Sequence, residues 1–367
     1  MKYLGLILFL ITFKSESFAV AKFSSSLPKI SDFSPSVELT DRVEFWRKIY
    51  SEYTTKQGVF HLTNDPDFIL GEIDLTPIYD NAVLKDQEKR RQIKLAIEEK
   101  RQQIAAKWKI SDVSKVRLQM GLKDRMEKAL FLSGRYLPMM EKIFRRNGLP
   151  IELTRIVFVE SSFNIYAQSK VGASGLWQIM PSVARPMGYI TRDYDKRNHP
   201  VYATELAAQI LKQNYKKLGS WPLAITAYNH GLTGVMRMKD KANSTNIEDL
   251  IESNETTKTW GFASKNFYAC FLAVLEVERN ATDLFGKNLI QSKASQFKEV
   301  RLSQTTSKSV ILKWYNGSTV RFKQLNPHLN WARITKTKPI PAGVPLVVPQ
   351  ENYRLASERS EKKSSLN

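Results

Sequence analysis

The sequence predicts a mainly α-helical protein that ends in a small C-terminal module of α+β or β structure. Between residues 41 and 278, apolar side chains recur at spacings of three to four, which is the period of an amphipathic helix. Gly and Pro end the longer of these segments, and beyond residue 298 short runs of β-branched and aromatic residues take over. The 367 residues suffice for about two domains with cores of their own.

The first residues predict export. Lys2 precedes an apolar run over residues 3–13 that is too short to span a bilayer, and small residues follow at two candidate cleavage points, Ala19 and Ala21. We therefore expect a secretory signal peptide at 1–21, with an uncleaved N-terminal anchor as the alternative. Residues 22–40 are rich in Ser and Pro and predict a linker.

Helices are then expected in order along the chain. An N-terminal helical region, 41–130, should contain an amphipathic helix at 41–53 and a long polar helix at 81–109, whose charged run is a solvated face. A helix at 116–146 leads into a domain at 131–290. In that domain further helices are expected at 152–163, 174–188, 202–218, 222–230 and 265–278, and a polar loop at 243–255.

The C-terminal part has a different character. Residues 310–312, 314–315 and 320–322 favour short strands, and 340–349 favour a closing edge strand. The second half of 297–350 resembles the end of a LysM carbohydrate-binding module, although the usual start of that module is missing. A packing appendage of the preceding domain is the alternative. Residues 351–367 are charged and Ser-rich and are expected to be disordered.

Charge and residue supply limit the function. Lys and Arg number 56 against 36 Asp and Glu, and a net charge of +20 indicates a polyanionic partner or working surface. Cys270 is the single cysteine, so no intrachain disulfide can form. The four His residues are far apart in the sequence and no Cys or His stands at ligand spacing, so no metal is expected.

Glu160 is the candidate catalytic residue. It closes an apolar run, residues 156–159, where water is scarce. Burial disfavours the charged carboxylate and raises its pKa above the ordinary value of about 4.3. A carboxyl that keeps its proton near neutrality can donate it to a leaving group, as a general acid must.

Three blocks of sequence around Glu160 carry a family resemblance. They are residues 148–164 (GLPIELTRIVFVESSFN), 167–181 (AQSKVGASGLWQIMP) and 221–231 (WPLAITAYNHG). In this order and spacing they resemble the lytic transglycosylases of the soluble-lytic-transglycosylase type, within them the membrane-bound murein transglycosylase D branch. The resemblance spans residues 133–278 and implies a lysozyme-like helical catalytic domain.

The resemblance also implies roles for individual residues. Glu160 is the acid, and Ser169 contacts the sugar or positions Glu160, unless it is a turn Ser that bonds its own backbone. Gln178 hydrogen-bonds the substrate, Met180 lines the cleft, and Tyr228 with Asn229 completes the site. In the family this Tyr points at the acid, and a buried Tyr that donates to the backbone is the alternative. His230 stands where the family usually has Ala.

The implied reaction needs one carboxylate and no cofactor. No acidic residue follows Glu160 within thirty positions, and Asp193, Asp195 and Glu205 are the nearest candidates beyond. The family cleaves the bond between N-acetylmuramic acid (MurNAc) and N-acetylglucosamine (GlcNAc) in peptidoglycan and forms a 1,6-anhydro product. A hydrolytic muramidase, a non-catalytic wall-binding protein and a secreted nucleic-acid binder, which rests on charge alone, are the alternatives.

The expected partner is the peptidoglycan glycan strand and not nucleic acid. The expected place of action is the periplasm or cell envelope of a bacterium, with peripheral wall or membrane association, and the expected state is a monomer.

Overall fold

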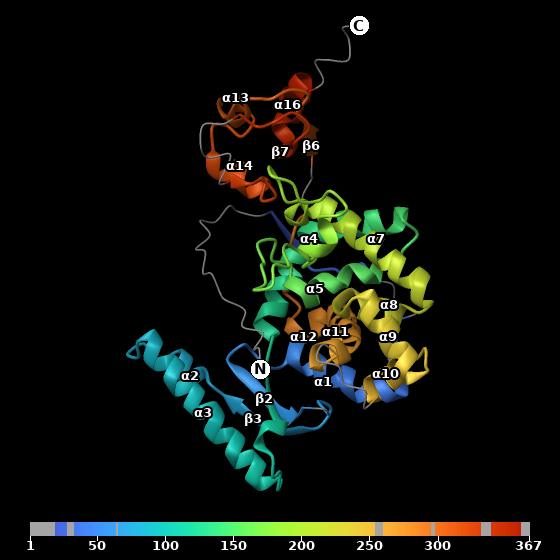
Figure 1. The fold of residues 1–367 in the computed structure, drawn as a ribbon. Coiled ribbons are helices and arrows are strands. Elements are labelled where there is room, and N and C mark those ends of the chain that lie inside the picture. The colour runs from blue at the N-terminus through green and yellow to red at the C-terminus, as the bar shows by residue number, and fades with distance from the viewer. Residues whose placement is uncertain are drawn as a thin grey trace.

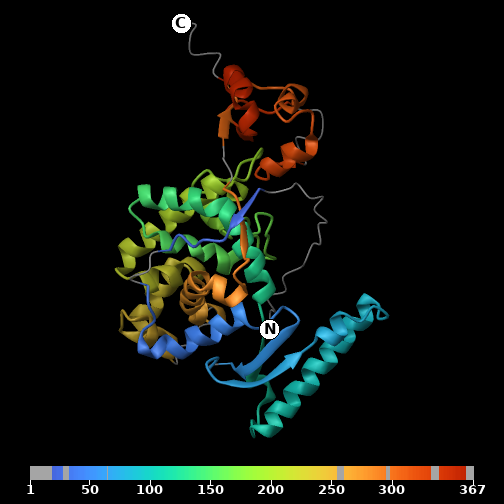
Figure 2. The same ribbon diagram turned by 180° about the vertical axis from the view of Figure 1, so that it is seen from behind.

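The computed structural model describes residues 19–27, 33–63, 65–253, 260–294, 298–331 and 339–360. Helices dominate these residues, so the prediction of a mainly α protein is confirmed. Figures 1 and 2 show a helical body, an arm that extends from it at one end and a separate small module at the other. Of the expected signal peptide, residues 1–18 lie outside the described residues.

The helical body is built around α11 (Phe262–Arg279), most of whose side chains are buried. Against it pack α1 (Thr40–Ser51), α5 (Ile156–Ser161) and α8 (Trp221–His230). The long helices α4 (Lys123–Arg146) and α7 (Pro200–Leu218) pack against each other, and α7 packs against α8. Shorter helices complete the body: α6 (Pro181–Ala184), α9 (Leu232–Ala242), α10 (Ile247–Glu252) and α12 (Ala281–Phe285).

Two expectations for the body are wrong. Residues 174–180 form a loop with isolated bridges instead of the start of a helix, because Gly175 and Gln178 adopt left-handed backbone angles that end helical pairing. Residues 247–252 of the polar segment 243–255, which was expected as a loop, form α10, whose Ile247, Leu250 and Ile251 are buried at helical spacing. Residues 254 and 255 lie outside the described residues.

The arm contains a sheet that the sequence analysis missed. Strands β2 (Gln57–Leu62), β3 (Ile69–Asp74) and β4 (Val116–Met120) pair antiparallel in the order β3-β2-β4. The long helix α3 (Asp86–Lys107) packs on this sheet, and a short helix, α2 (Thr76–Tyr79), precedes it. The region 41–130 is therefore not wholly helical. The pairing of β2 with β4 joins residues far apart in sequence, which local periodicity does not report.

The segment expected as a linker is packed on the body. Strand β1 (Val20–Lys22) pairs antiparallel with β5 (Ile290–Ser292), and Phe23 is buried. Further along, Phe33 is 4% exposed and its ring lies edge-on to Phe271 of α11. Ser-rich and Pro-rich composition predicts exposure, but these two aromatic rings fix the described part of the segment in place.

The C-terminal module has its own core. Strands β6 (Lys298–Arg301) and β7 (Pro345–Val348) pair antiparallel, and α13 (Lys308–Lys313) and α14 (Thr319–Leu325) lie between them in the chain. Of the strands expected over 310–322, residues 310–312 and 320–322 are helical and residues 314–315 form a turn. Ser318 caps α14 by accepting a hydrogen bond from the Arg321 amide. Buried residues include Trp314, Tyr315, Phe322 and Leu346.

The predicted disordered tail is helical in its first part. Helix α16 (Tyr353–Ser360) packs on the module through Ala356, which is fully buried. Residues 361–367 lie outside the described residues. The resemblance of this module to LysM stays a prediction. The same holds for the domain limits given above.

The module docks on the segment that precedes α7. The Asp195 amide donates to the His328 carbonyl over 2.7 Å, and the Asn330 amide donates to the Asp193 carbonyl over 2.8 Å. The rings of His199 and His328 meet in this interface with centroids 4.6 Å apart, and each residue is only 1% exposed. Neither ring nitrogen of His199 has a hydrogen-bond partner among the described residues.

These two histidines should make the protein sensitive to acid. Burial lowers the pKa of His328 to about 4 and that of His199 well below 6.5, with His328 and Lys196 adding repulsion at His199. The Glu299 carboxylate lies 3.7 Å from His199 Nε2 and favours the charged ring, but burial outweighs it. In the unfolded chain these histidines bind protons at a higher pH than they do in the folded protein. The free energy of unfolding should therefore fall as the pH drops from about 6.5 towards 4, by up to ~1.4 kcal/mol per pH unit for each ring.

Calorimetric unfolding at pH 7.5 and pH 5 measures this loss. The His199→Phe variant, which keeps an aromatic ring but cannot titrate, should show a shallower dependence on pH. An identical dependence in the variant and the wild type would contradict the assignment.

Candidate active site

Glu160 lies at the carboxyl end of the short helix α5. Ile156, Val157 and Phe158 bury the preceding turn, and Ser162 and Phe163 then take left-handed angles that end the helix. The Glu160 side chain is half-buried, and none of the described residues donates a hydrogen bond to its carboxyl. Burial alone raises the pKa of Glu160 from 4.5 to about 8. The carboxyl therefore holds its proton at neutral pH.

The loop at 167–180 lies against the end of α5. Ser161 Oγ donates to the Leu176 carbonyl over 2.7 Å. Within the loop, Gln178 Nε2 donates to the carbonyls of Ala167 and Gly175 over 3.0 and 2.8 Å. Both hydrogen bonds hold the loop closed on itself. Gln178 therefore has its amide protons directed at the backbone, and its Oε1 is the atom left for a ligand.

Ser169 occupies a turn of the same loop. Its Oγ accepts a hydrogen bond from the Ala173 amide over 2.9 Å, which is the turn geometry named above as its alternative role. Because the hydroxyl accepts here, its proton can still be donated. Met180 is half-buried and immediately precedes α6.

Trp177 is a core residue. It is 0% exposed, stacks on Phe144 at a centroid distance of 5.6 Å, and donates from Nε1 to Thr204 Oγ1 over 2.9 Å. The ring anchors the loop to the body between α4 and α7.

Tyr228 connects the loop to α8. Its hydroxyl donates to the Trp177 carbonyl over 2.8 Å, so its proton goes to the backbone. Burial raises the pKa of Tyr228 well above 10, and the nearby Glu160 carboxylate adds to the shift. Asn229 is exposed and accepts from Ser264 Oγ over 3.3 Å. The same Ser264 hydroxyl lies 3.0 Å from His230 Nδ1, which places His230 against α11.

Tyr50 was missed by the sequence analysis. It lies on α1 and is 5% exposed. Burial raises its pKa well above 10, the Cys270 thiol raises it further, and Glu160 also contributes. A buried Tyr in an amphipathic helix more than a hundred residues before the acid carries no sequence signal for a place beside it.

Two acidic residues that follow Glu160 in the sequence form ion pairs. Asp195 forms an ion pair with Arg197 at 2.6 Å, and Glu205 forms one with Arg146. No group of three or more His, Cys, Asp or Glu side chains that could hold a metal ion is found within the described ranges.

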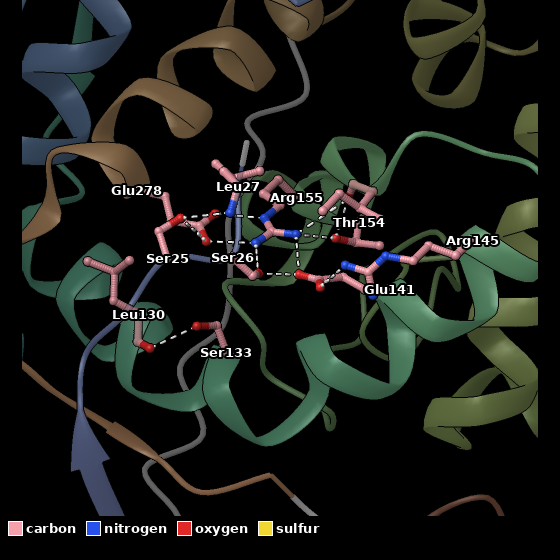
Figure 3. Close-up of polar contacts among 11 residues, drawn as sticks. Ser25, Ser26, Leu27, Leu130, Ser133, Glu141, Arg145, Thr154, Arg155 and Glu278 are labelled. Carbon is pink, nitrogen blue, oxygen red and sulfur yellow. Dashed lines mark hydrogen bonds and ion pairs between the residues drawn. The ribbon is translucent and has the colours of Figure 1, made fainter. Parts of the chain in front are cut away.

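A buried ion cluster holds the base of α5 (Figure 3). Arg155, fully buried directly before α5, pairs with Glu141 of α4 and Glu278 of α11, both at 2.7 Å. Arg155 Nη2 also donates to Ser26 Oγ over 2.8 Å, and Ser25 Oγ donates to Glu278 over 3.1 Å. Helices α4 and α11 and the N-terminal segment therefore meet at Arg155, the residue directly before α5.

Part of the chain is similar in sequence to known proteins. Residues 139–251 match the family model of the Transglycosylase SLT domain. Membrane-bound lytic murein transglycosylase D of Escherichia coli (strain K12) is 32% identical over 143 residues, which are 37% of this chain and 30% of that protein.

Membrane-bound lytic murein transglycosylase C of Actinobacillus pleuropneumoniae serotype 5b (strain L20) is 31% identical over 120 residues, 29% of this chain and 33% of that protein. The chain thus spans about a third of the length of these relatives. A solved structure of the 70 kDa soluble lytic transglycosylase of Escherichia coli is 20% identical, with a TM-score of 0.33, over 45% of this chain and 26% of that one.

Removal of the Arg155 charge should destabilise the body strongly. In Arg155→Met the carboxylates of Glu141 and Glu278 stay buried without their cation, and we expect a loss of about 3 to 5 kcal/mol in the free energy of unfolding. Urea unfolding measures it. Arg145→Met is the matched control, because Arg145 is 59% exposed in its pair with Glu141 and should cost less than ~1 kcal/mol. Equal losses in the two variants would refute the role of the cluster.

Proposed function

We propose that this protein is a peptidoglycan lytic transglycosylase that cleaves the β-1,4 bond between MurNAc and GlcNAc and leaves a 1,6-anhydro-MurNAc end. The observation that carries the proposal is the Glu160 carboxyl, which burial keeps protonated at neutral pH inside an SLT domain. The relatives named as lytic murein transglycosylases support the substrate class.

Glu160 acts first as an acid in this mechanism. Its carboxyl gives a proton to the glycosidic oxygen, the bond from that oxygen to MurNAc C1 breaks, and GlcNAc leaves with a free hydroxyl. The oxocarbenium-like MurNAc is assisted by its own N-acetyl group. Glu160, now a carboxylate, takes the proton from the MurNAc C6 hydroxyl, and that oxygen bonds to C1. The carboxyl is protonated again at the end of the cycle.

Two features support a single carboxylate. Hydrolysis through paired carboxylates needs a second one about 5 to 9 Å from the first, and Asp195 and Glu205 are committed to Arg partners. A carboxyl without hydrogen-bond donors can change its charge twice in one turnover without breaking a bond in the protein. A hydrolytic muramidase stays the second candidate, and product analysis separates the two.

The loop and α8 supply the substrate contacts in this proposal. Ser169 donates its hydroxyl proton to a sugar oxygen, Gln178 accepts through Oε1, and Met180 forms an apolar wall. Tyr228 interacts electrostatically with Glu160 and fixes the Trp177 backbone, and the exposed Asn229 contacts the glycan.

The working place is the bacterial cell envelope in this proposal. A net charge of +20 suits a carboxylate-rich wall, and the module at 297–350 would bind glycan if it is a divergent LysM module. No described helix has the length and apolarity to cross a membrane. Peripheral wall or membrane association and a monomeric state complete the proposal.

The rate of cleavage should fall as the pH rises through about 8. The acid must be protonated when it meets the substrate, and Glu160 loses its proton at that pH. The profile of kcat/KM against pH, measured on soluble glycan strands, should therefore have an alkaline limb near pH 8. An alkaline limb below pH 5.5 would mean that Glu160 is an ordinary solvated carboxylate.

Glu160→Gln should abolish product formation while glycan binding remains. The amide cannot donate and then accept a proton, and we expect a loss of roughly 10²- to 10⁴-fold in rate. Mass spectrometry of digested sacculi reports the product, with an anhydro end expected from the wild type and a reducing end expected from a muramidase. Glu205→Gln is the matched control and should keep its activity. Full function in Glu160→Gln would identify a non-catalytic wall-binding protein.

A further inference from the structure

Arg197 lies directly behind the loop that faces Glu160. It belongs to a short 3-10 turn, Lys196–Asn198, ahead of α7, and it is only 7% exposed. A guanidinium is always charged and presents donors in a planar fork, so its burial requires several acceptors in fixed positions. Neither the family resemblance nor the charge analysis singled out this residue.

The guanidinium bridges the two ends of the site loop. Arg197 Nη1 donates to the Gly172 carbonyl over 2.7 Å and to the Ile179 carbonyl over 2.8 Å. Gly172 lies before and Ile179 lies after the Gly175 turn and Gln178. One nitrogen therefore sets the distance between the two ends of this loop.

A carboxylate fixes the orientation of the guanidinium. Arg197 Nε lies 3.0 Å from Asp195 Oδ1, and Nη2 lies 2.6 Å from Asp195 Oδ2. Such a two-point pair between a guanidinium and a carboxylate leaves the remaining nitrogen, Nη1, aimed in one direction. The Asp195 backbone is itself held by the C-terminal module through the carbonyl of His328.

The loop rests on the Arg197 segment without spare room. A Cβ on Gly175 would lie 2.2 Å from the Arg197 carbonyl oxygen, so only Gly fits at this contact, and its φ of +78° also favours Gly. Ser174 Oγ donates to Asn198 Oδ1 over 2.7 Å. The side chain and the backbone of the segment thus act on the same loop.

We propose that Arg197, oriented by Asp195, is a positioning residue that sets the glycan-binding shape of the loop at 172–179. The inference rests on the proposed function, because the ligand of that loop is taken to be a glycan strand. Arg197 does not touch Glu160, whose pKa is raised by burial alone. Loss of Arg197 therefore weakens glycan binding and leaves the proton chemistry unchanged.

The test compares Arg197→Met and Arg197→Lys in the full chain. Arg192→Met is the matched control, since Arg192 is an exposed cation of the preceding loop. In Arg197→Met we expect KM to rise by roughly 10- to 100-fold, the effect of freeing buried acceptors, with the alkaline limb of the pH profile unmoved. Lys can reach a carbonyl but cannot make the two-point pair with Asp195, so Arg197→Lys should lie between Met and the wild type.

Binding of soluble glycan strands in the Glu160→Gln background keeps the two proposals separate. The Arg197 substitution should weaken this binding, measured by calorimetry, even if the wild type turns out to hydrolyse the bond or to release no product. Thermal unfolding shows whether each variant is folded. If Arg197→Met does not fold, the KM and the glycan binding of Arg197→Lys test the proposal. Wild-type KM and binding in a folded Arg197 variant, or a shifted pH limb at unchanged KM, would overturn the assignment.

Discussion

The site depends on shielding one half-buried carboxylic acid, Glu160, from much of the water without giving it a hydrogen-bond or charged partner. Apolar residues of α5 supply the dry surroundings, and the left-handed turn at Ser162 ends the helix directly after Glu160. Desolvation is the only contribution that shifts the pKa of Glu160. A donor or a cation on the carboxyl would favour the charged form and cancel the effect. The absence of such a group among the described residues is therefore as necessary as the burial.

Two buried acids at the start of α5, Glu141 and Glu278, show the opposite solution. Both are almost fully buried, but Arg155 pairs with each of them, and the serines of the N-terminal segment add hydrogen bonds. That cluster anchors the start of α5, whereas the end of α5 is held by Ser161 and the loop. The ion pairs of Arg155 therefore fix the start of α5 in place. At the other end of α5, Glu160 has no charged partner, so its carboxyl remains free to gain and lose a proton.

The spacing of apolar residues along the sequence predicted the mainly helical class. The position of Glu160 at the end of an apolar run predicted its burial. Both features depend only on residues that are close together in the sequence. They did not predict the sheet of the arm, since β2 pairs with β4 across more than fifty residues. Short apolar runs at 310–322 suit strands and helices equally, and the Ser318 cap decided for α14. Tyr50 and Arg197 reach the site only through tertiary packing, so no spacing in the sequence marks them.

The most direct test is an infrared titration of the Glu160 carboxyl in the folded protein, taken as the difference between the wild type and Glu160→Gln. The C=O stretch of a protonated carboxylic acid reports the state of this single group. Our account predicts a protonated signal at pH 7 that disappears with a midpoint near pH 8. A carboxylate already ionised at pH 6 would contradict it, because the group could then not donate a proton to a glycosidic oxygen at neutral pH.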